Sequence, residues 1–204
     1  MSNQQVVRVE LGERSYNVVI GSGVRSQIAS MVPSTAKRAV IVTQATIPFS
    51  VEESLVAAGI STRTINIGLG EEFKSLATIE MILRECAQFG LTRNDVIIGV
   101  GGGMVTDIAG FAASAWHRGI AVVHVSTTLV GMVDAAIGGK TGVNLAEGKN
   151  LVGAFWQPRG VLCDTDALAS LSPRETRCGN GEMAKYHFLT GDDLLSLDLN
   201  SRIA

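Results

Sequence analysis

The stretch Val96–Ala115, which reads VIIGVGGGMVTDIAGFAASA, decides the fold. Its first five residues are apolar, which is typical of a strand buried on both faces. Three glycines, Gly101 to Gly103, follow the strand, and the residues from Val105 to Ala115 can form a helix. Such a turn lets the backbone and the start of a helix approach a phosphate. The same glycines would also suit a tight turn without a ligand, and the GxGxxG fingerprint is not met, because its last position falls on Met104 or Thr106.

Strands and helices alternate on both sides of this stretch. With short connections between them, this alternation predicts an α/β fold, a Rossmann-like parallel sheet with helices on both faces. At the start of the chain, the segments 6–11 and 16–20 alternate apolar and polar residues around Gly12, which predicts a β-hairpin. The other predicted strands are 38–43, 61–67, 96–100, 121–125 and 160–163, and the predicted helices are 50–58, the segment between Ser75 and Gly90, and 105–115.

Composition limits the class of protein. The chain has 204 residues, of which 46% are hydrophobic and 18% are charged, so it can bury a core. Its apolar runs are shorter than the roughly 18 residues that a membrane span needs. A formal net charge of −2 predicts no attraction to nucleic acid or to a membrane surface, so an anionic ligand must be held by local cations. Three cysteines without paired spacing and a polar N-terminus predict a cytoplasmic protein.

The pattern changes after Asp164, where capped helical segments replace the alternation and Pro173 suits the first turn of a helix. We therefore expect a domain of residues 1–171 and the beginning of an α-helical domain in residues 172–204. The segment 192–204 has helical apolar spacing. About 30 residues are too few to bury a core of their own, so the second domain is expected to be truncated.

Polar residues are dense after the predicted strand 121–125. The carboxyl ends of strands form the ligand crevice of an α/β sheet, so we expect a site in this loop. Gly139-Lys140-Thr141 is similar to the end of a P-loop, but Asp134 stands where that motif needs a small residue and would repel a phosphate. Lys140 and Lys149 could also be solvated surface lysines. The polar residues of this loop are Thr127, Thr128, Asp134, Lys140, Asn144, Lys149 and Asn150.

The histidines of the sequence do not have the spacing of a metal-binding site. His117 and His124 lie on different elements, and no HxxxH pair occurs, so a structural role is the simpler interpretation for each. Glu182, Lys185 and Tyr186 share one face of the helix that Pro173 opens. Glu182 and Lys185 can equally be an exposed ion pair.

Several motifs together resemble the 3-dehydroquinate synthase family, the sugar-phosphate cyclases of the shikimate pathway. The resemblance covers nearly the whole chain and is most specific from Asp134 to Phe155. It is carried by GEEFK (70–74), GGGMVTDIAGF (101–111), TTL (127–129), VDAAIGGKT (133–141), GKNLVGAF (148–155) and QP (157–158).

The resemblance implies an N-terminal NAD-binding domain, a divalent metal that is zinc or cobalt, and a homodimer of the complete protein. Arg118 matches an arginine offered to the neighbouring subunit's site, and Glu182 matches a metal ligand. The positions that match the cofactor site are Glu71, Lys74, Gly102, Gly103, Met104, Asp107, Thr127, Thr128, Lys140, Lys149 and Ser170. Those that match the catalytic and substrate site are Asp134, Lys140, Lys149, Asn150, Lys185 and Arg118.

The reaction that the resemblance implies converts 3-deoxy-arabino-heptulosonate 7-phosphate into 3-dehydroquinate and phosphate. Oxidation of a ring hydroxyl acidifies the neighbouring C–H, phosphate leaves, the ketone is reduced again, and an intramolecular aldol step closes the ring. The family's two zinc histidines lie in a C-terminal domain, so this chain alone is expected to be inactive. A related cyclase of the valiolone or deoxy-inosose synthase type, or a non-catalytic NAD-binding module, are the alternatives.

Overall fold

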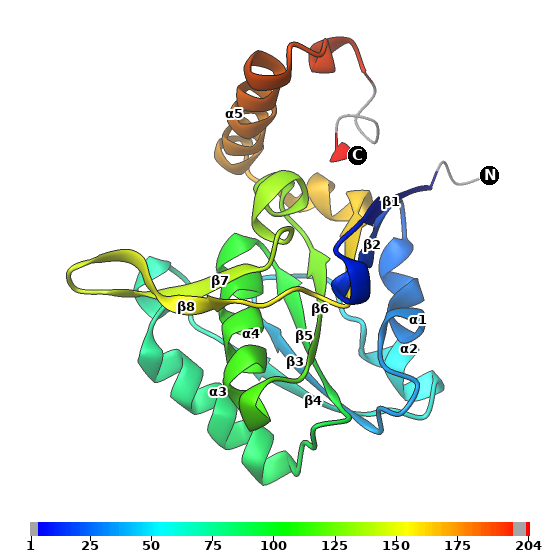
Figure 1. The fold of residues 1–204 in the computed structure, drawn as a ribbon, viewed down its shortest axis with the longest axis vertical. Coiled ribbons are helices and arrows are strands. Elements are labelled where there is room, and N and C mark those ends of the chain that lie inside the picture. Colours follow the sequence, from blue (N-terminus) through cyan, green and yellow to red (C-terminus); the bar gives the residue numbers. More distant parts are fainter. Residues whose placement is uncertain (1–3, 198–202) are drawn as a thin grey trace.

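The computed structural model describes residues 4–197 and 203–204 as a layered α/β fold (Figure 1). Its strands are β1 (Gln5–Val9), β2 (Tyr16–Gly21), β3 (Arg38–Thr43), β4 (Ser61–Asn66), β5 (Val96–Gly101), β6 (Ala121–Ser126), β7 (Lys140–Leu145), β8 (Gly148–Phe155) and β9 (Gly160–Asp164). Its α-helices are α1 (Ile28–Met31), α2 (Glu52–Ala57), α3 (Leu76–Phe89), α4 (Gly103–Ala115) and α5 (Pro173–Thr190).

Seven strands form one sheet in the order β1-β2-β9-β6-β5-β3-β4. β1 and β2 pair antiparallel, and every other neighbouring pair in this sheet is parallel. The predicted N-terminal hairpin and parallel sheet are therefore confirmed. After β3 the chain adds β4 on one side and then β5, β6 and β9 on the other, so the strand order reverses between β3 and β5. Ligands of open α/β sheets bind beyond the carboxyl ends of the strands at such a switch point.

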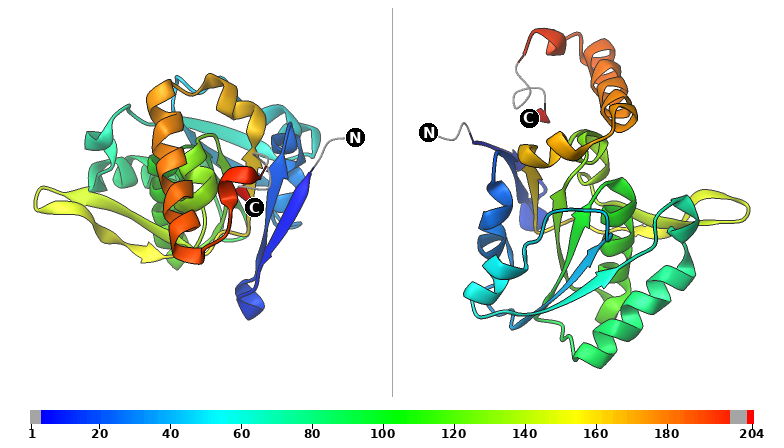
Figure 2. Two further views of the ribbon diagram at one scale, coloured as in Figure 1. Left: turned by 90° about the horizontal axis from the view of Figure 1, so that it is seen from above. Right: turned by 180° about the vertical axis from the view of Figure 1, so that it is seen from behind.

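Helices cover both faces of the sheet, as predicted. On one face, Ile82 of α3 and Ile108 of α4 pack with Val40 and Ile97 of the sheet. On the other face, Ile28 of α1 and Leu55 of α2 pack against other residues of the same strands. Strand residues alternate between the two faces, so strands with apolar residues at successive positions fill both cores. Figure 2, seen from behind, shows the helices on either side of the strands.

Local signals set the ends of α3 and α4. The Ser75 hydroxyl accepts a hydrogen bond from the Thr78 backbone N–H, and Gly90 ends α3 at a φ of 69°. α4 begins at Gly103, two residues before the predicted Val105, directly after Gly102 leaves β5. The strand–glycine–helix turn expected from Val96–Ala115 is therefore present.

The segment 127–150 is not the loop that the sequence analysis expected. Gly131–Ala135 forms a π-helical turn, and β7 and β8 form a two-stranded hairpin that projects to one side (Figures 1 and 2). The hairpin packs on α4 at Gly110, where a Cβ would lie only 2.3 Å from Thr141 Cγ2. Glycines and polar residues dominate this segment, so its strand pattern is weak in the sequence.

α5 lies apart from the sheet, beyond the carboxyl ends of the parallel strands (Figure 1). It begins at a capping box in which Ser172 and Glu175 bond to each other's backbone N–H, and Gly191 ends it. The segment 192–204, for which helical spacing was noted, lies partly outside the described residues, which omit 198–202; its described part contains a 3-10 turn, Leu194–Ser196. No helix among the described residues is long and apolar enough to cross a membrane.

His124 is a buried polar residue within β6. It is 3% exposed, and its Nδ1 atom has no hydrogen-bond partner. The ring packs beside Gly99 of β5, where a Cβ would lie 3.1 Å from Nδ1. Burial disfavours the charged imidazolium and lowers the pKa of His124 to about 4. The structural role expected for this histidine fits these surroundings.

We predict that His124 destabilises the fold in acid. Its pKa is near 6.5 in the unfolded chain and about 4 in the folded chain, so the unfolded state binds the extra proton between these values. The free energy of unfolding should therefore fall as the pH drops through this window, by about 1.4 kcal/mol per pH unit from this residue. Urea unfolding at pH 7 and at pH 4.5 measures this. Between the two pH values, His124→Gln should lose less unfolding free energy than the wild type. An equal loss in both proteins would contradict the assignment.

Candidate active site

Six of the predicted cofactor residues line one groove of about 510 Å³ at the switch point. The glycine turn after β5, the residues after β6 and the 3-10 helix after β9 bring them together. The first turn of α4 opens into this groove, and the N–H groups of Gly103 and Met104 there precede the first helical hydrogen bonds, which Val105 and Thr106 donate to the Gly102 carbonyl. The groove can therefore hold an anionic group of a dinucleotide. The six residues are Gly102, Gly103, Met104, Thr127, Thr128 and Ser170.

Glycine is required in this turn by close contacts. A Cβ on Gly102 would lie 2.8 Å from Thr128 Cγ2, and a Cβ on Gly103 would lie 2.8 Å from Ala135 Cβ. Thr128 is held in place because its Oγ1 accepts a hydrogen bond of 3.1 Å from the Gly131 N–H. Close packing therefore requires glycine at both positions, and the two glycines form a cradle in the lining of the groove that larger residues would fill.

A buried lysine lies at the centre of a second group of predicted residues. Lys74 is 6% exposed, and its Nζ lies 2.5 Å from Asp107 Oδ2 and 2.5 Å from Asn150 Oδ1. Burial raises the pKa of Asp107, and the hydrogen bond and charge of Lys74 oppose this rise. Lys74 lies in the turn before α3, Asp107 lies on α4, and Asn150 lies on β8. One ammonium group thus joins three elements.

Glu71 and Lys149 extend this group to the surface. Asn144 Nδ2 donates a hydrogen bond of 2.8 Å to Glu71 Oε1, and Lys149 Nζ lies 3.5 Å from the same oxygen. The Asn144 hydrogen bond is the main cause that lowers the pKa of Glu71, which therefore stays ionised. Asn144 is one of the polar residues noted between Thr127 and Asn150, but it was not among the predicted site residues.

A neighbouring pocket of about 420 Å³ contains the predicted substrate residues Asp134, Lys140 and Asn150, together with Asp107. Lys140 Nζ lies 3.9 Å from Asp134 Oδ1, and the lysine side chain is 68% exposed. This loose pair leaves the ammonium group free to bind an anion. Lys149 faces Glu71 and is not part of this pocket lining.

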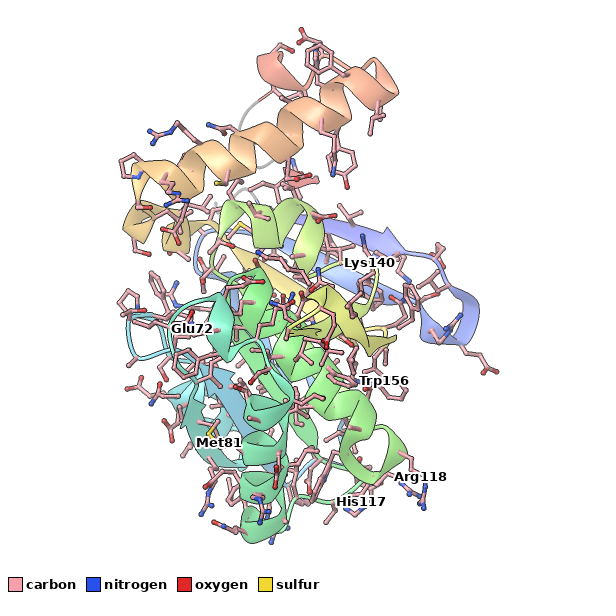
Figure 3. The ribbon with its side chains drawn as sticks, turned by 90° about the vertical axis from the view of Figure 1, so that its left-hand side faces the viewer. Glu72, Met81, His117, Arg118, Lys140 and Trp156 are labelled. Atoms are coloured by element: carbon pink, nitrogen blue, oxygen red, sulfur yellow. The ribbon has the colours of Figure 1, made fainter. Side chains whose placement is uncertain are left out.

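Arg118, Glu182 and Lys185 lie outside this pocket. Arg118 lies at the opposite end of α4 from Lys140 (Figure 3), in a turn where His117 and Arg118 have φ values of 50° and 66°. Glu182 and Lys185 form an ion pair on α5, and Lys185 Nζ lies 4.8 Å from the centre of the Tyr186 ring. Among the described residues, no group of three or more His, Cys, Asp or Glu side chains is placed to hold a metal ion.

Other residues also line this groove: Gln44, which the family resemblance places near the adenosine end of NAD, and two residues of α5 that were not predicted for the site. Gln44 follows β3, and its amide donates a hydrogen bond of 2.9 Å to the Gly68 carbonyl. Arg174 and Cys178 of α5 line the opposite side. No sequence signal could place α5 beside the groove, because its position depends on the turn after β9.

Comparison with known proteins identifies related sequences. Residues 64–178 match the family model described as 3-dehydroquinate synthase N-terminal. A protein of Amycolatopsis mediterranei, provisionally named an aminodehydroquinate synthase, is 46% identical over 199 residues, covering 97% of this chain and 55% of the relative. The 3-dehydroquinate synthase of Nitrobacter winogradskyi is 44% identical over 200 residues, covering 94% of this chain and 51% of the relative. The chain spans about half the length of these relatives.

Solved structures with similar folds include two cyclases. 2-Deoxy-scyllo-inosose synthase in complex with carbaglucose-6-phosphate, NAD+ and Co2+ matches with a TM-score of 0.82 and 30% identity, over 89% of this chain and 50% of that protein. The 2-epi-5-epi-valiolone synthase of Streptomyces hygroscopicus, with NAD+ and Zn2+ bound, matches with a TM-score of 0.76 and 34% identity, over 87% and 50%. By fold and by sequence, this chain belongs to the 3-dehydroquinate synthase family, of which it carries the N-terminal portion.

Proposed function

We propose that this chain is the NAD-binding part of a 3-dehydroquinate synthase, a carbon–oxygen lyase that converts 3-deoxy-arabino-heptulosonate 7-phosphate into 3-dehydroquinate and phosphate. The observation that carries the proposal is the arrangement around α4. The glycine turn at its start lines the cofactor groove, and Asp107, one turn later, lines the pocket of Asp134, Lys140 and Asn150. A cofactor and a substrate bound in these two places would adjoin each other.

We further propose that residues 1–171 form the cofactor domain and that residues 172–204 begin a helical domain. α5, which stands apart from the sheet with Phe188 83% exposed, supports this division. The exposed Arg118 at the far end of α4 supports a homodimer in which this arginine serves the neighbouring subunit's site. The three free cysteines support a cytoplasmic location.

The residues of the groove fit NAD. The Gly102–Gly103 cradle and the first turn of α4 suit the pyrophosphate, and Thr127 and Thr128 offer hydroxyl groups in the same groove. When bound, NAD supplies a reversible oxidation of one substrate hydroxyl. The charges of Lys74 and Asp107 neutralise each other in an ion pair. Because Asp107 belongs to the first turns of α4, this pair also holds that part of the helix in place.

The pocket residues suit a polyanionic sugar phosphate. The Lys140 ammonium is exposed enough to bind a phosphate or carboxylate group, and Asp134 can accept a hydrogen bond from a sugar hydroxyl. The Asn150 Oδ1 atom already accepts from Lys74, so its NH2 group is left to donate to the substrate. Lys149, next to Asn150 in the sequence, adds positive charge near Glu71.

The described residues do not form a complete metal site. Glu182 is the one residue with a proposed metal role, and it is ion-paired with Lys185. A carboxylate can contribute one ligand to zinc or cobalt, but a site needs three or four. We propose that the other ligands belong to the part of the relatives that this chain does not span, with Lys185 left to bind substrate.

A second candidate function follows from the relative of Amycolatopsis mediterranei, whose name points to an amino counterpart of dehydroquinate. The two candidates differ in one substituent of the substrate. Rates measured with both sugar phosphates, on a complete protein that carries this chain, would separate them. A higher kcat/KM with the amino substrate would overturn the leading proposal.

Gly102→Ala should weaken NAD binding by this chain about 10-fold or more, because its Cβ would push Thr128 out of the cradle. The matched control is Gly181→Ala, since a Cβ at Gly181 meets nothing within 4 Å. Calorimetric titration of NAD into the wild type and both variants measures the effect. The absence of binding by the wild type, or equal binding by all three proteins, would contradict the proposed cofactor site.

The 204-residue chain should release no phosphate from 3-deoxy-arabino-heptulosonate 7-phosphate in the presence of NAD and zinc, because its metal site is incomplete. A coupled phosphate assay on the pure chain measures this. Turnover at roughly 1 per second, typical of enzymes, would show that this part of the protein suffices for catalysis.

A further inference from the structure

The hairpin of β7 and β8 has an irregular stretch beside the substrate pocket. Val143 pairs with Val152, and Leu145 pairs with Gly148, so Asn144 alone faces the three residues 149–151. A regular ladder cannot pair one residue with three. Asn150 lies in the middle of this stretch with a φ of 56°, a left-handed conformation that asparagine adopts more readily than most residues with a side chain but that a ladder residue does not have. The pocket residue Asn150 therefore needs support from outside the ladder.

Asn144 supplies that support with its side chain. Its Oδ1 accepts a hydrogen bond of 2.9 Å from the Asn150 backbone N–H. In effect, a side-chain carbonyl replaces the ladder partner that the irregular stretch removes. Asparagine suits this position because its amide presents both an acceptor and a donor group.

The same residue also bonds to the loop before α3. Its backbone N–H donates to the Lys74 carbonyl at 2.8 Å, and its Nδ2 donates to Glu71 Oε1 at 2.8 Å. Support of the hairpin alone would not require these two bonds, since Glu71 and Lys74 lie about 70 residues earlier in the chain. Asn144 thus connects the Glu71–Lys74 loop directly to Asn150.

We propose that Asn144 is a positioning residue that sets the geometry of Asn150 and couples the cofactor side of the site to the substrate side. This inference rests on the proposed function, because it takes Glu71 and Lys74 as cofactor residues and Asn150 as a substrate residue. Asn144 lines neither the groove at the start of α4 nor the pocket of Asp134 and Lys140, so it acts through these three residues.

The first test is NAD binding by Asn144→Ala, with Asn94→Ala as the matched control. Asn94 is exposed and precedes β5, at the end of the sheet away from the site. Asn144→Ala should weaken NAD binding roughly 3- to 30-fold, a range typical of residues that couple sites, and Asn94→Ala should leave it unchanged. Thermal unfolding monitors the fold of each variant. Equal NAD affinity in Asn144→Ala and the wild type would overturn the coupling.

The second test is the pH dependence of Asn144→Asp, which a purely structural role would not produce. Near pH 7.5 the new carboxylate would face ionised Glu71 and repel it, and NAD binding should be weakened relative to the wild type. Near pH 5 the two carboxyl groups can share a proton, so the donor to Glu71 is restored. The ratio of variant to wild-type affinity should therefore rise at the lower pH, and a constant ratio would contradict the proposal.

The third test does not depend on NAD. Amide hydrogen exchange of Asn150, measured by NMR, should be at least about 10-fold faster in Asn144→Ala, while exchange of the β5 amides is unchanged. Unchanged exchange at Asn150 would overturn the support that Asn144 gives it. A wild-type chain that fails to bind NAD would instead count against the proposed function, whereas the exchange comparison still decides the role of Asn144 toward Asn150.

Discussion

The buried contact of Lys74 with Asp107 and Asn150 is the interaction on which the candidate site depends. An ammonium group that is 6% exposed must be paired, because the burial of an isolated charge costs several kcal/mol. Its partners come from α4 and β8, so the pairing holds the hairpin and the Glu71–Lys74 loop against the same helix. Loss of Lys74 or Asp107 would leave the charge of the other without compensation, at a cost of about 3 kcal/mol.

Around this contact, α4 serves both parts of the site. Its first turn faces the groove at the switch point, and Asp107, one turn later, faces the pocket below the hairpin. Gly110, a further turn along, lets the hairpin lie directly on the helix. Three positions at successive turns thus place the proposed cofactor cradle, a half-buried acid and the hairpin of the proposed substrate pocket along one side of a single helix.

Much of the sheet could be predicted from local patterns. The strand Arg38–Thr43 and the helix between Ser75 and Gly90 have the predicted ends, because an apolar run and a pair of caps are signals that neighbouring residues carry. The hairpin of β7 and β8 could not be predicted in this way. Its strands interrupt their apolar residues with glycines and polar residues and lack a regular alternation, and what makes them strands is their packing on α4. The resemblance to the family named the site residues, whereas residue spacing alone could not show that Lys74 and Asn150 meet.

The sequence by itself determined the class of fold, the position of the glycine turn and the membership of a family of cyclases, because these depend on periodicity, caps and motifs that are local in the chain. Only the tertiary structure decided that Asn144 joins Glu71 to Asn150, that Arg174 and Cys178 face the cofactor groove, and that Arg118 lies far from Lys140. These are relations between segments far apart in the sequence. They arise when side chains from different elements must satisfy their charges and hydrogen bonds within one packed interior.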